Sequence, residues 1–302
     1  MDEDVEYICR YLPDILPLGL FDIVSRYLSI YPDMSEIRIR RGSCLSFTVG
    51  DRNVETVYIC DQEMIESCLT LWVGDSKYKY SDSILRGVIP LTHGFRVGIA
   101  GKALIVDGSV RNVYDLSSFA IRLPRCYKGC SSVIYEYING LPRYERSMLI
   151  VSPPCGGKTT VIRDLIHKLS TPPVAERVCV VDTRCELGIF DGVFNTHVDV
   201  FSGYPIEIGI EIATRYFNPQ YIVCDEIGGE REICPILNAA NAGVPLIATA
   251  HSPSLSGLVL KNNIRILFES NVFCNVAVLK LLDKTLQVDF YDSDDIKDVL
   301  RS

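Results

Sequence analysis

The 302-residue sequence predicts an α/β fold for its second half and a smaller α+β domain before it. From residue 148 onward, short apolar runs alternate with helical stretches, which is typical of a mostly parallel sheet with helices on both faces. The first third instead mixes short strand and helix patterns. Gly, Pro and charged residues at 138–147 separate the two regions. We therefore expect an N-terminal domain at 1–138 and an α/β domain at 139–302.

Local patterns predict the N-terminal elements in order. Residues 21–33 carry apolar side chains at helical spacing up to a Pro-Asp pair. Residues 35–42, SEIRIRRG, alternate charged and apolar side chains, as a half-buried strand does. Residues 45–59 are typical of a hairpin that turns near Gly50-Asp51. Further strands are expected over 86–113, which glycines divide into short pieces.

The C-terminal elements alternate regularly. The expected strands are 148–151, 178–181, 221–224 and 245–249, and the expected helices are 158–169, 205–217 and 230–242. The acidic tail after residue 290 is compatible with a final short helix.

Composition disfavours several classes of function. The formal net charge is −8, and nucleic-acid binding needs clustered Lys and Arg, so we expect no nucleic-acid partner. The acidic start does not resemble a signal peptide, and no apolar run approaches the ~18–20 residues that span a bilayer. The 12 cysteines are scattered without a C-x-x-C pair, which predicts reduced thiols. We expect a cytoplasmic chain that reaches a membrane only through partners.

Residues 152–159, SPPCGGKT, resemble the phosphate-binding loop G-x-x-x-x-G-K-[ST] except at the first position. A predicted strand leads into this loop and a predicted helix follows, so backbone N–H groups and the helix dipole would face an anion. Lys158 would bridge the β- and γ-phosphates, and the Thr159 hydroxyl would bind Mg²⁺. At a strand end with negative φ, a small residue such as Ser can replace glycine. The candidate nucleotide-binding residues are Ser152, Pro153, Pro154, Cys155, Gly156, Gly157, Lys158, Thr159 and Thr160.

A second acidic site follows 67 residues after Lys158, in PQYIVCDEIGG. Asp225 ends an apolar strand, where a carboxylate can reach the Mg²⁺ shell. The adjacent Glu226 can orient and polarise a water molecule for attack on the γ-phosphate. The two motifs together favour ATP hydrolysis over nucleotide binding alone.

Two further strand ends complete a recognisable order. In VCVVDTRCEL a predicted strand ends with Asp182 and Glu186, and in PLIATAHSPS another ends with Thr249 and His251. The order of loop, acidic box, Asp-Glu pair and His resembles that of the secretion-type ATPases. Longer stretches, spanning roughly residues 35–280, are similar to the stage III sporulation protein AA family of endospore-forming bacteria. Members of that family commonly have the loop sequence S-P-P-x-x-G-K-T-T, which accounts for Ser152. They also commonly have D-E-R-S-E where this chain has Asp182-Thr183-Arg184-Cys185-Glu186, so the inner Glu is missing here.

The resemblance implies a RecA-like P-loop ATPase domain that works in a hexameric ring. MgATP would lie between the two domains and against a neighbouring subunit, and arginines from the first domain or the neighbour would complete the γ-phosphate site. The resemblance also implies membrane-embedded partners in the channel between mother cell and forespore, with this chain on the mother-cell side. The residues to which it gives candidate roles are Arg96, Arg122, Arg125, Arg184, Glu186 and His251.

Two alternatives stay open from sequence. A RecA-like ATPase that depends on nucleic acid would show hydrolysis stimulated by single-stranded DNA with a steep salt dependence. A structural ring that binds ATP would show tight binding with little turnover. A small-molecule kinase is disfavoured because no Arg-rich lid is visible in the sequence.

Overall fold

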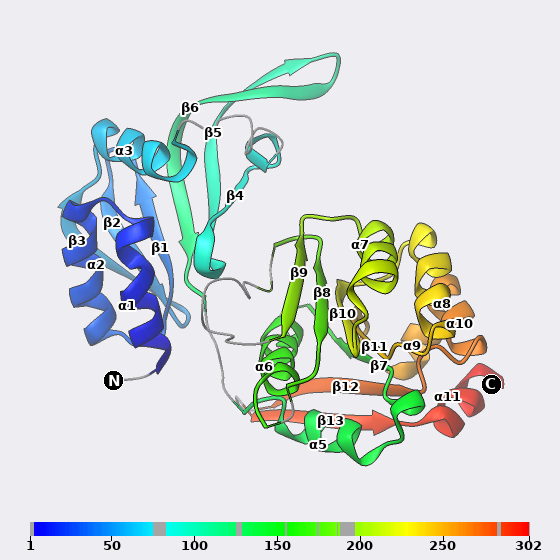
Figure 1. Ribbon diagram of the computed structural model, residues 1–302. Helices are drawn as coiled ribbons and strands as arrows, with labels where there is room; N and C mark the ends of the chain where they lie inside the picture. Colours follow the sequence, from blue (N-terminus) through cyan, green and yellow to red (C-terminus); the bar gives the residue numbers. More distant parts are fainter. Residues whose placement is uncertain are drawn as a thin grey trace. The chain divides into compact units, whose positions relative to one another are not determined.

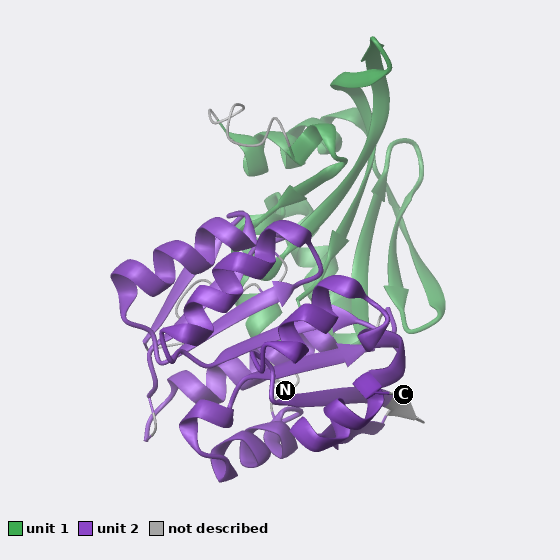
Figure 2. Ribbon diagram, turned by 90° about the vertical axis from the view of Figure 1, so that its right-hand side faces the viewer, with its two compact units in different colours: residues 1–125 green, residues 126–302 purple. Residues whose placement is uncertain are grey.

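The computed structural model describes residues 3–74, 83–124, 129–154, 156–173, 175–185, 187, 197–282 and 285–301. The chain forms two compact units, Met1–Arg125 and Cys126–Ser302, shown in separate colours in Figure 2. Among the described residues, no helix combines the length and the apolar character needed to cross a membrane.

Unit 1 is an α+β unit built on a six-stranded sheet with the order β3-β2-β1-β6-β5-β4 (Figure 1). All neighbouring strands are antiparallel. The hairpin expected at 45–59 is confirmed, with Val49 opposite Arg52 across the turn. The helices are α1 (Glu3–Ile15), α2 (Leu18–Ile30) and α3 (Gln62–Val73), and the strands are β1 (Met34–Arg40), β2 (Cys44–Val49), β3 (Arg52–Ile59), β4 (Val88–Pro90), β5 (Arg96–Val106) and β6 (Ser109–Arg122).

The two faces of this sheet differ in chemistry. Ile37, Phe47 and Ile121 are fully buried in one cluster with residues of α1, α2 and α3. Because successive strand residues point to opposite faces, Glu36 and Arg122 project from the other face. The first face forms the core of unit 1, and the second carries charged side chains.

Unit 2 is an α/β unit with the strand order β13-β12-β7-β11-β10-β8-β9. The strands from β12 to β9 pair in parallel, and β13 joins β12 antiparallel, so the sheet is mixed but largely parallel, as predicted. The strands are β7 (Met148–Ser152), β8 (Val178–Asp182), β9 (Val198–Ser202), β10 (Tyr221–Glu226), β11 (Leu246–His251), β12 (Asn275–Leu282) and β13 (Thr285–Tyr291).

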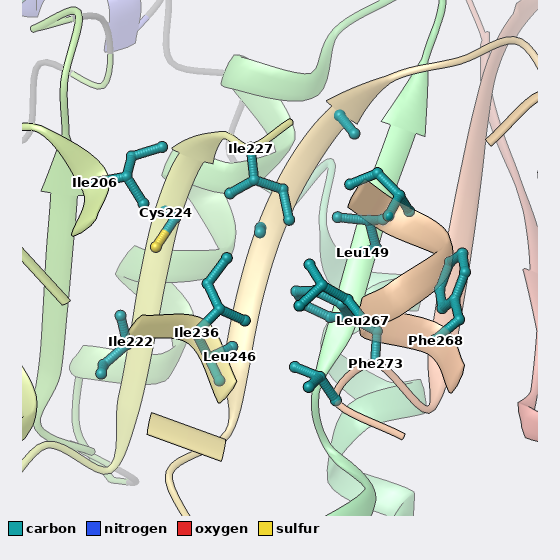
Figure 3. Packing of buried hydrophobic residues seen from close by; sticks show 14 of the residues in the cluster. Leu149, Ile206, Ile222, Cys224, Ile227, Ile236, Leu246, Leu267, Phe268 and Phe273 are labelled. Carbon is teal, nitrogen blue, oxygen red and sulfur yellow. The ribbon is translucent and has the colours of Figure 1, made fainter. Parts of the chain in front are cut away.

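Helices cover both faces of the second sheet, which is why its central strands are apolar on both sides. One face packs against α7 to α11, and Figure 3 shows Leu149, Ile222 and Phe268 from this cluster. The other face packs against α5 and α6. The helices are α5 (Ser132–Gly140), α6 (Lys158–Ser170), α7 (Ile206–Ile212), α8 (Ile233–Asn241), α9 (Leu255–Val259), α10 (Asn262–Glu269) and α11 (Ser293–Arg301), and a π-helical turn, Ala213–Phe217, follows α7.

The division between the units lies upstream of the expected boundary at 138/139. Helix α5 belongs to unit 2 because Ile134 and Ile138 are fully buried in the cluster beneath α6. The Gly-Pro segment that follows α5 is therefore a loop inside unit 2 and does not join the units.

Candidate functional site

The carboxyl ends of β7, β11, β10 and β8 lie side by side at one edge of the second sheet. Three of these strands end in Ser152, Asp182 and Thr249-Ala250-His251. The residues two positions before Ser152, Asp182 and Thr249 all belong to the cluster beneath α6. Because side chains alternate along a strand, these polar residues face the same side as the N-terminus of α6.

Two glycines shape the loop that begins α6. A Cβ on Gly156 would lie 2.3 Å from Ser152 Oγ and 3.0 Å from the carbonyl oxygen of Pro153, so a larger residue does not fit. Gly157 has φ of +86°, a left-handed conformation that strains any residue with a Cβ. Ser152 is fully buried and donates a hydrogen bond to the Pro153 carbonyl at 2.7 Å. The loop is therefore tightly closed, and serine at its first position contributes a bond.

Lys158 is the first residue of α6 and is buried at 8% exposure. Its Nζ lies 3.3 Å from the Ser152 carbonyl oxygen and 3.2 Å from Ser152 Oγ. It also lies 2.9 Å from His251 Nδ1. Burying an ammonium group is costly unless its donors are used, and these acceptors use them. The cation is thus held over the loop by acceptors that include a carbonyl, a hydroxyl and an imidazole, which an anion could displace.

His251 connects this lysine to the neighbouring acidic strand. An ammonium group can only donate, so His251 Nδ1 accepts from Lys158 and its Nε2 carries the proton. Nε2 lies 3.3 Å from Glu226 Oε2, within the distance of an ion pair. Arg184 Nη1 lies 2.8 Å from the same Oε2. A continuous chain of contacts therefore runs from Lys158 through His251 and Glu226 to Arg184.

Asp225 lies at an irregularity between β10 and β11. Cys224 pairs with Ala248 and Glu226 pairs with Thr249, so β10 has one extra residue at Asp225. Such a bulge re-aims the side chains of a strand. The Thr249 hydroxyl donates to the Asp225 carbonyl at 3.1 Å, and the Asp225 side chain is buried. Burial raises the pKa of the preceding Cys224 thiol, so this cysteine packs as a neutral core residue.

The segment after β8 is fastened by Asp182, which is fully buried. Its Oδ2 accepts a hydrogen bond from the Leu187 backbone N–H at 2.9 Å. Its carbonyl accepts from the Gly203 N–H at 2.9 Å. Arg163 on α6 donates to the Leu187 carbonyl. The turn that carries Arg184 is therefore tied to both the sheet and α6.

Asp164 on α6 holds the start of unit 2 and was not singled out from sequence. Its carboxylate accepts from the backbone N–H groups of Gly129 and Ser131 at 2.9 and 2.8 Å, and from the Ser131 hydroxyl at 2.6 Å. The carboxylate is 3% exposed. The available signal was an acidic residue inside the apolar stripe of a helix, between Val161 and Leu165, because such a residue needs buried partners.

The remaining predicted residues fall into two groups. Cys155, Glu186 and Arg125 lie outside the described residues. Arg96 and Arg122 belong to unit 1, where they are opposite each other on β5 and β6.

Strand β6 lies between β5 and β1, and Glu36 on β1 is the partner of Arg122 on that side. Glu36 Oε2 is 3.9 Å from Arg122 Nε. Arg38 donates to the second carboxylate oxygen of Glu36. Glu36 therefore offsets the repulsion between Arg96 and Arg122, which face each other directly.

The residues at the edge of unit 2 fit a nucleoside triphosphate with Mg²⁺. The loop is closed by glycines, a buried lysine lies at the helix N-terminus, and the dipole of α6 favours anions there. Mg²⁺ prefers oxygen ligands, and the Thr159 hydroxyl and the Asp225 carboxylate are two groups that could supply them. Thr159 and Thr160 occupy the first turn of α6 and are half-buried.

Residues 7–295 match the model of a protein family described as "Sporulation stage III, protein AA". The chain belongs to this family. It is 28% identical over 277 residues to Stage III sporulation protein AA of Bacillus subtilis (strain 168), with 88% of each chain covered. It is also 29% identical over 153 residues to Protein SEEDLING PLASTID DEVELOPMENT 1 of Arabidopsis thaliana, but that match covers only 22% of the plant protein.

Solved structures resemble this chain in fold. The ATPase DotB of Legionella pneumophila superposes with a TM-score of 0.65 at 17% identity, covering 94% of this chain and 83% of DotB. The pilus retraction motor PilT, solved with ADP, gives 0.62 at 15% identity, covering 93% and 86%. These similarities show the α/β fold with its largely parallel sheet. The sequence-based identification of the family is confirmed.

Proposed function

We propose that this protein is an ATP hydrolase of the secretion-motor type, with a RecA-like P-loop ATPase domain in unit 2. The observation that carries the proposal is the chain of contacts from Lys158 through His251 to Glu226. It joins the phosphate loop to the acid at the end of β10. P-loop enzymes need these two groups on opposite sides of one γ-phosphate. Family membership and the likeness to DotB and PilT support the same activity.

Each residue has a distinct part in this proposal. Backbone N–H groups of the loop and the Lys158 ammonium bind the β- and γ-phosphates. Thr159 and Asp225 would hold Mg²⁺, which would supply charge neutralisation on the phosphate oxygens. Glu226 accepts a hydrogen bond from the attacking water and orients it. Most of the rate acceleration comes from positioned charge.

The contacts of Lys158 also explain how phosphate binding is sensed. Anionic oxygens are stronger acceptors for an ammonium group than a neutral imidazole is. When Lys158 turns to phosphate, His251 Nδ1 loses its donor, and the contact between His251 and Glu226 is free to rearrange. Arg184, whose Nη1 lies 2.8 Å from Glu226 Oε2, would exchange this partner for a γ-phosphate oxygen.

Arginines of unit 1 are proposed to complete the site. The row formed by Glu36, Arg122 and Arg96 presents positive charge on the polar face of the first sheet. Arg125, beyond the end of β6, is a third candidate. Such residues, from the same chain or from a neighbour, would stabilise charge in the transition state.

The proposed working form is a hexameric ring on the mother-cell side of the membrane. Family membership suggests that its work is delivered to membrane-embedded proteins of a channel between mother cell and forespore. The domains of this machine correspond to the two compact units. Nucleic acid has no proposed part, in keeping with the net charge of −8.

Phosphate release by the full chain tests the catalytic proposal, over a range of protein concentrations because neighbouring subunits complete the site. Lys158→Ala should lose both ATP binding and hydrolysis. Glu226→Gln should bind a fluorescent ATP analogue normally and hydrolyse ATP at least about 100-fold more slowly. Lys297→Ala and Glu269→Gln are matched controls, since both residues form exposed ion pairs in unit 2, on α11 and α10. Unchanged turnover in either site variant overturns the proposal.

Two additional measurements separate the alternatives. Hydrolysis that rises sharply with single-stranded DNA, and falls again with salt, would favour a nucleic-acid-dependent ATPase. Tight ATP binding without turnover at any protein concentration would favour a structural ring. Native mass with and without MgATP tests the ring, which predicts a sixfold mass.

A further inference from the structure

The hairpin of β5 and β6 extends beyond the rest of the first sheet as a two-stranded ribbon (Figure 1). We define the ribbon as residues 102–114. Strands β1 and β4 pair with the lower parts of β6 and β5, at 118–122 and 96–98. All residues from 100 to 112 are exposed. Asp107 and Gly108 both have positive φ, which forms the tight turn at its tip.

The ribbon exposes an unusual amount of apolar surface. Leu104 and Ile105 are 50% and 62% exposed, and Val106, Val110 and Tyr114 are each at least 40% exposed. Cross-strand pairing places Ala103 beside Val113 and Ile105 beside Val110, so one face of the ribbon is entirely aliphatic there. An isolated hairpin is marginally stable in water, and exposed apolar strands mark interaction sites. The ribbon therefore has the character of a docking element.

The base of the ribbon is fixed. Asp115, with φ of +47°, accepts hydrogen bonds from Arg41 and Lys102 at 2.8 Å each. Gly101 lies where a Cβ would come within 2.8 Å of the Tyr114 carbonyl oxygen. These contacts set the direction in which the ribbon leaves the sheet, so its apolar face is presented in advance of binding.

A complementary groove lies elsewhere on unit 1. It has a volume of about 530 Å³ and is lined by residues of α1, α2 and α3 and of the α1–α2 loop. Its apolar lining includes Pro13, Leu18 and Leu71, with Leu18 81% exposed. Glu63 and Glu66 add negative charge. Trp72 Nε1 donates to the Ile15 carbonyl at 2.7 Å, which ties α3 to the end of α1 and fixes the walls.

We propose that the ribbon of one copy of this chain docks into the groove of a second copy. Both elements are apolar, and Arg111 of the ribbon is opposite in charge to Glu63 and Glu66 of the groove. The other charged residues of the ribbon are Asp107 in its turn and Lys102, which pairs with Asp115 at its base. With a net charge of −8 on each copy, the local pairing of opposite charges selects this contact among other surfaces. Because both elements are held rigidly within unit 1, the ribbon does not reach its own groove.

The contact joins two different surfaces, so it is head-to-tail and adds copies in one direction. The inference goes beyond the proposed function and is independent of ATP hydrolysis, because only unit 1 takes part. It applies equally to an open chain of copies or to a closed ring.

Sedimentation velocity of the full chain without nucleotide tests the contact. The mass of the wild type should rise with concentration. Ile105→Asp on the ribbon and Leu18→Asp in the groove should each lower the association constant at least about tenfold, because each buries a charge in an apolar contact. Val57→Asp is the matched control, since Val57 is an exposed aliphatic residue of the same unit at 99% exposure, outside both surfaces. It should associate like the wild type.

Sedimentation of an equimolar mixture of the two variants is the decisive experiment. The Leu18→Asp chain keeps its ribbon and the Ile105→Asp chain keeps its groove, so an equimolar mixture should form one-to-one dimers and nothing larger. A second arm reverses charge, with Arg111→Glu weakening association and Glu66→Lys on the partner copy restoring it. Lys158→Ala should associate normally, which separates this inference from the proposed hydrolysis.

Three results overturn the inference. A wild type that stays monomeric at all concentrations removes the contact. If Leu18→Asp self-associates like the wild type and Ile105→Asp does not, the groove is not the binding site. The ribbons of two copies would then pair with each other. A mixture that stays monomeric removes the head-to-tail geometry.

Discussion

His251 joins the cation of the phosphate loop to the acid of the neighbouring strand through its two ring nitrogens. Its tautomer is fixed because Lys158 can only donate, so Nε2 carries the proton toward Glu226. Lys261 fixes the backbone, since its Nζ lies 2.6 Å from the His251 carbonyl oxygen. The imidazole is therefore oriented through both ring nitrogens on an anchored backbone, which suits a group that couples two others.

His251→Ala tests this coupling. We expect ATP affinity to change less than about threefold, because the loop and Lys158 remain, while turnover falls about 10- to 100-fold, at the low end for an oriented catalytic group. Steady-state kinetics give KM and kcat separately, and His197→Ala is the control because His197 is exposed and contributes only a backbone bond to β8. A loss confined to KM would contradict the coupling role.

Gly156→Ala tests the closure of the loop. The added Cβ would lie 2.6 Å from Ser152 Cβ and 3.0 Å from the Pro153 carbonyl, so backbone must shift at a cost of about 1–3 kcal/mol. The expected result is an ATP affinity at least about tenfold lower, measured by titration with a fluorescent analogue. Gly140→Ala is the control, because nothing lies within 4 Å of its added Cβ. Equal affinity of the two variants would show that the loop tolerates expansion.

At the scale of elements, helix α6 combines the phosphate loop at its first residue with the anchor Asp164 farther along. Asp164→Ala leaves the backbone N–H groups of Gly129 and Ser131 and the Ser131 hydroxyl without their acceptor. Each group of the buried Ser131 that loses its partner costs about 1–3 kcal/mol. We expect unit 2 to lose about 3 kcal/mol, measured by urea unfolding, and faster hydrogen exchange at these two amides. Asp298→Ala, on the exposed side of α11, should change neither.

The clamp at the base of the ribbon makes part of the stability of unit 1 depend on pH. Hydrogen bonds and charge from Arg41 and then Lys102 lower the pKa of Asp115 from 3.8 to about 2. A carboxyl whose pKa is lower in the folded state contributes fully above its ordinary pKa, and this contribution is lost as pH falls from about 4 to about 2.

Asp115→Asn should remove that part of the acid dependence in thermal melts between pH 5 and pH 2. Asp107→Asn, in the turn of the same ribbon, should retain the wild-type profile, since asparagine also tolerates positive φ. Identical slopes for Asp115→Asn and the wild type would show that the clamp contributes nothing.

The central strands and helices of unit 2 were predictable because each is a short, uniformly apolar run or a periodic stretch. Other elements were not predicted. Strand β9 carries Asp199 in its middle and lies at the sheet edge, so its pattern is weak. In β12 and β13, apolar and polar residues mix because one strand is central and the other is at the edge. The assignment of α5 to unit 2 depends on tertiary packing under α6, which no local pattern reveals.

The candidate site was predictable to a similar degree. Motif residues at the strand ends could be found in order, and the structure brings Lys158, His251, Glu226 and Arg184 together. The bonds that Ser152 makes to its own loop, and the anchor at Asp164, depend on distances between distant segments. The roles of Arg96 and Arg122 stay predictions.

At the scale of the whole molecule, each unit has its own hydrophobic core. One cluster of buried residues lies within unit 1, and the two others lie within unit 2, on opposite faces of its sheet. Among the described residues, no cluster draws buried side chains from both units. Each unit therefore has the ingredients of an independent folding domain.

Calorimetry of the full chain should show two unfolding transitions, of which nucleotide shifts only one. The phosphate loop belongs to unit 2, so MgADP at 100 times its Kd should stabilise that transition by about 2.7 kcal/mol and leave the other in place. Ile37→Ala, in the core of unit 1, should lower only the second transition, by about 2–5 kcal/mol. Lys158→Ala should abolish the shift caused by nucleotide without moving the transition of unit 1. A single transition that responds both to nucleotide and to Ile37→Ala would show that the two cores unfold as one.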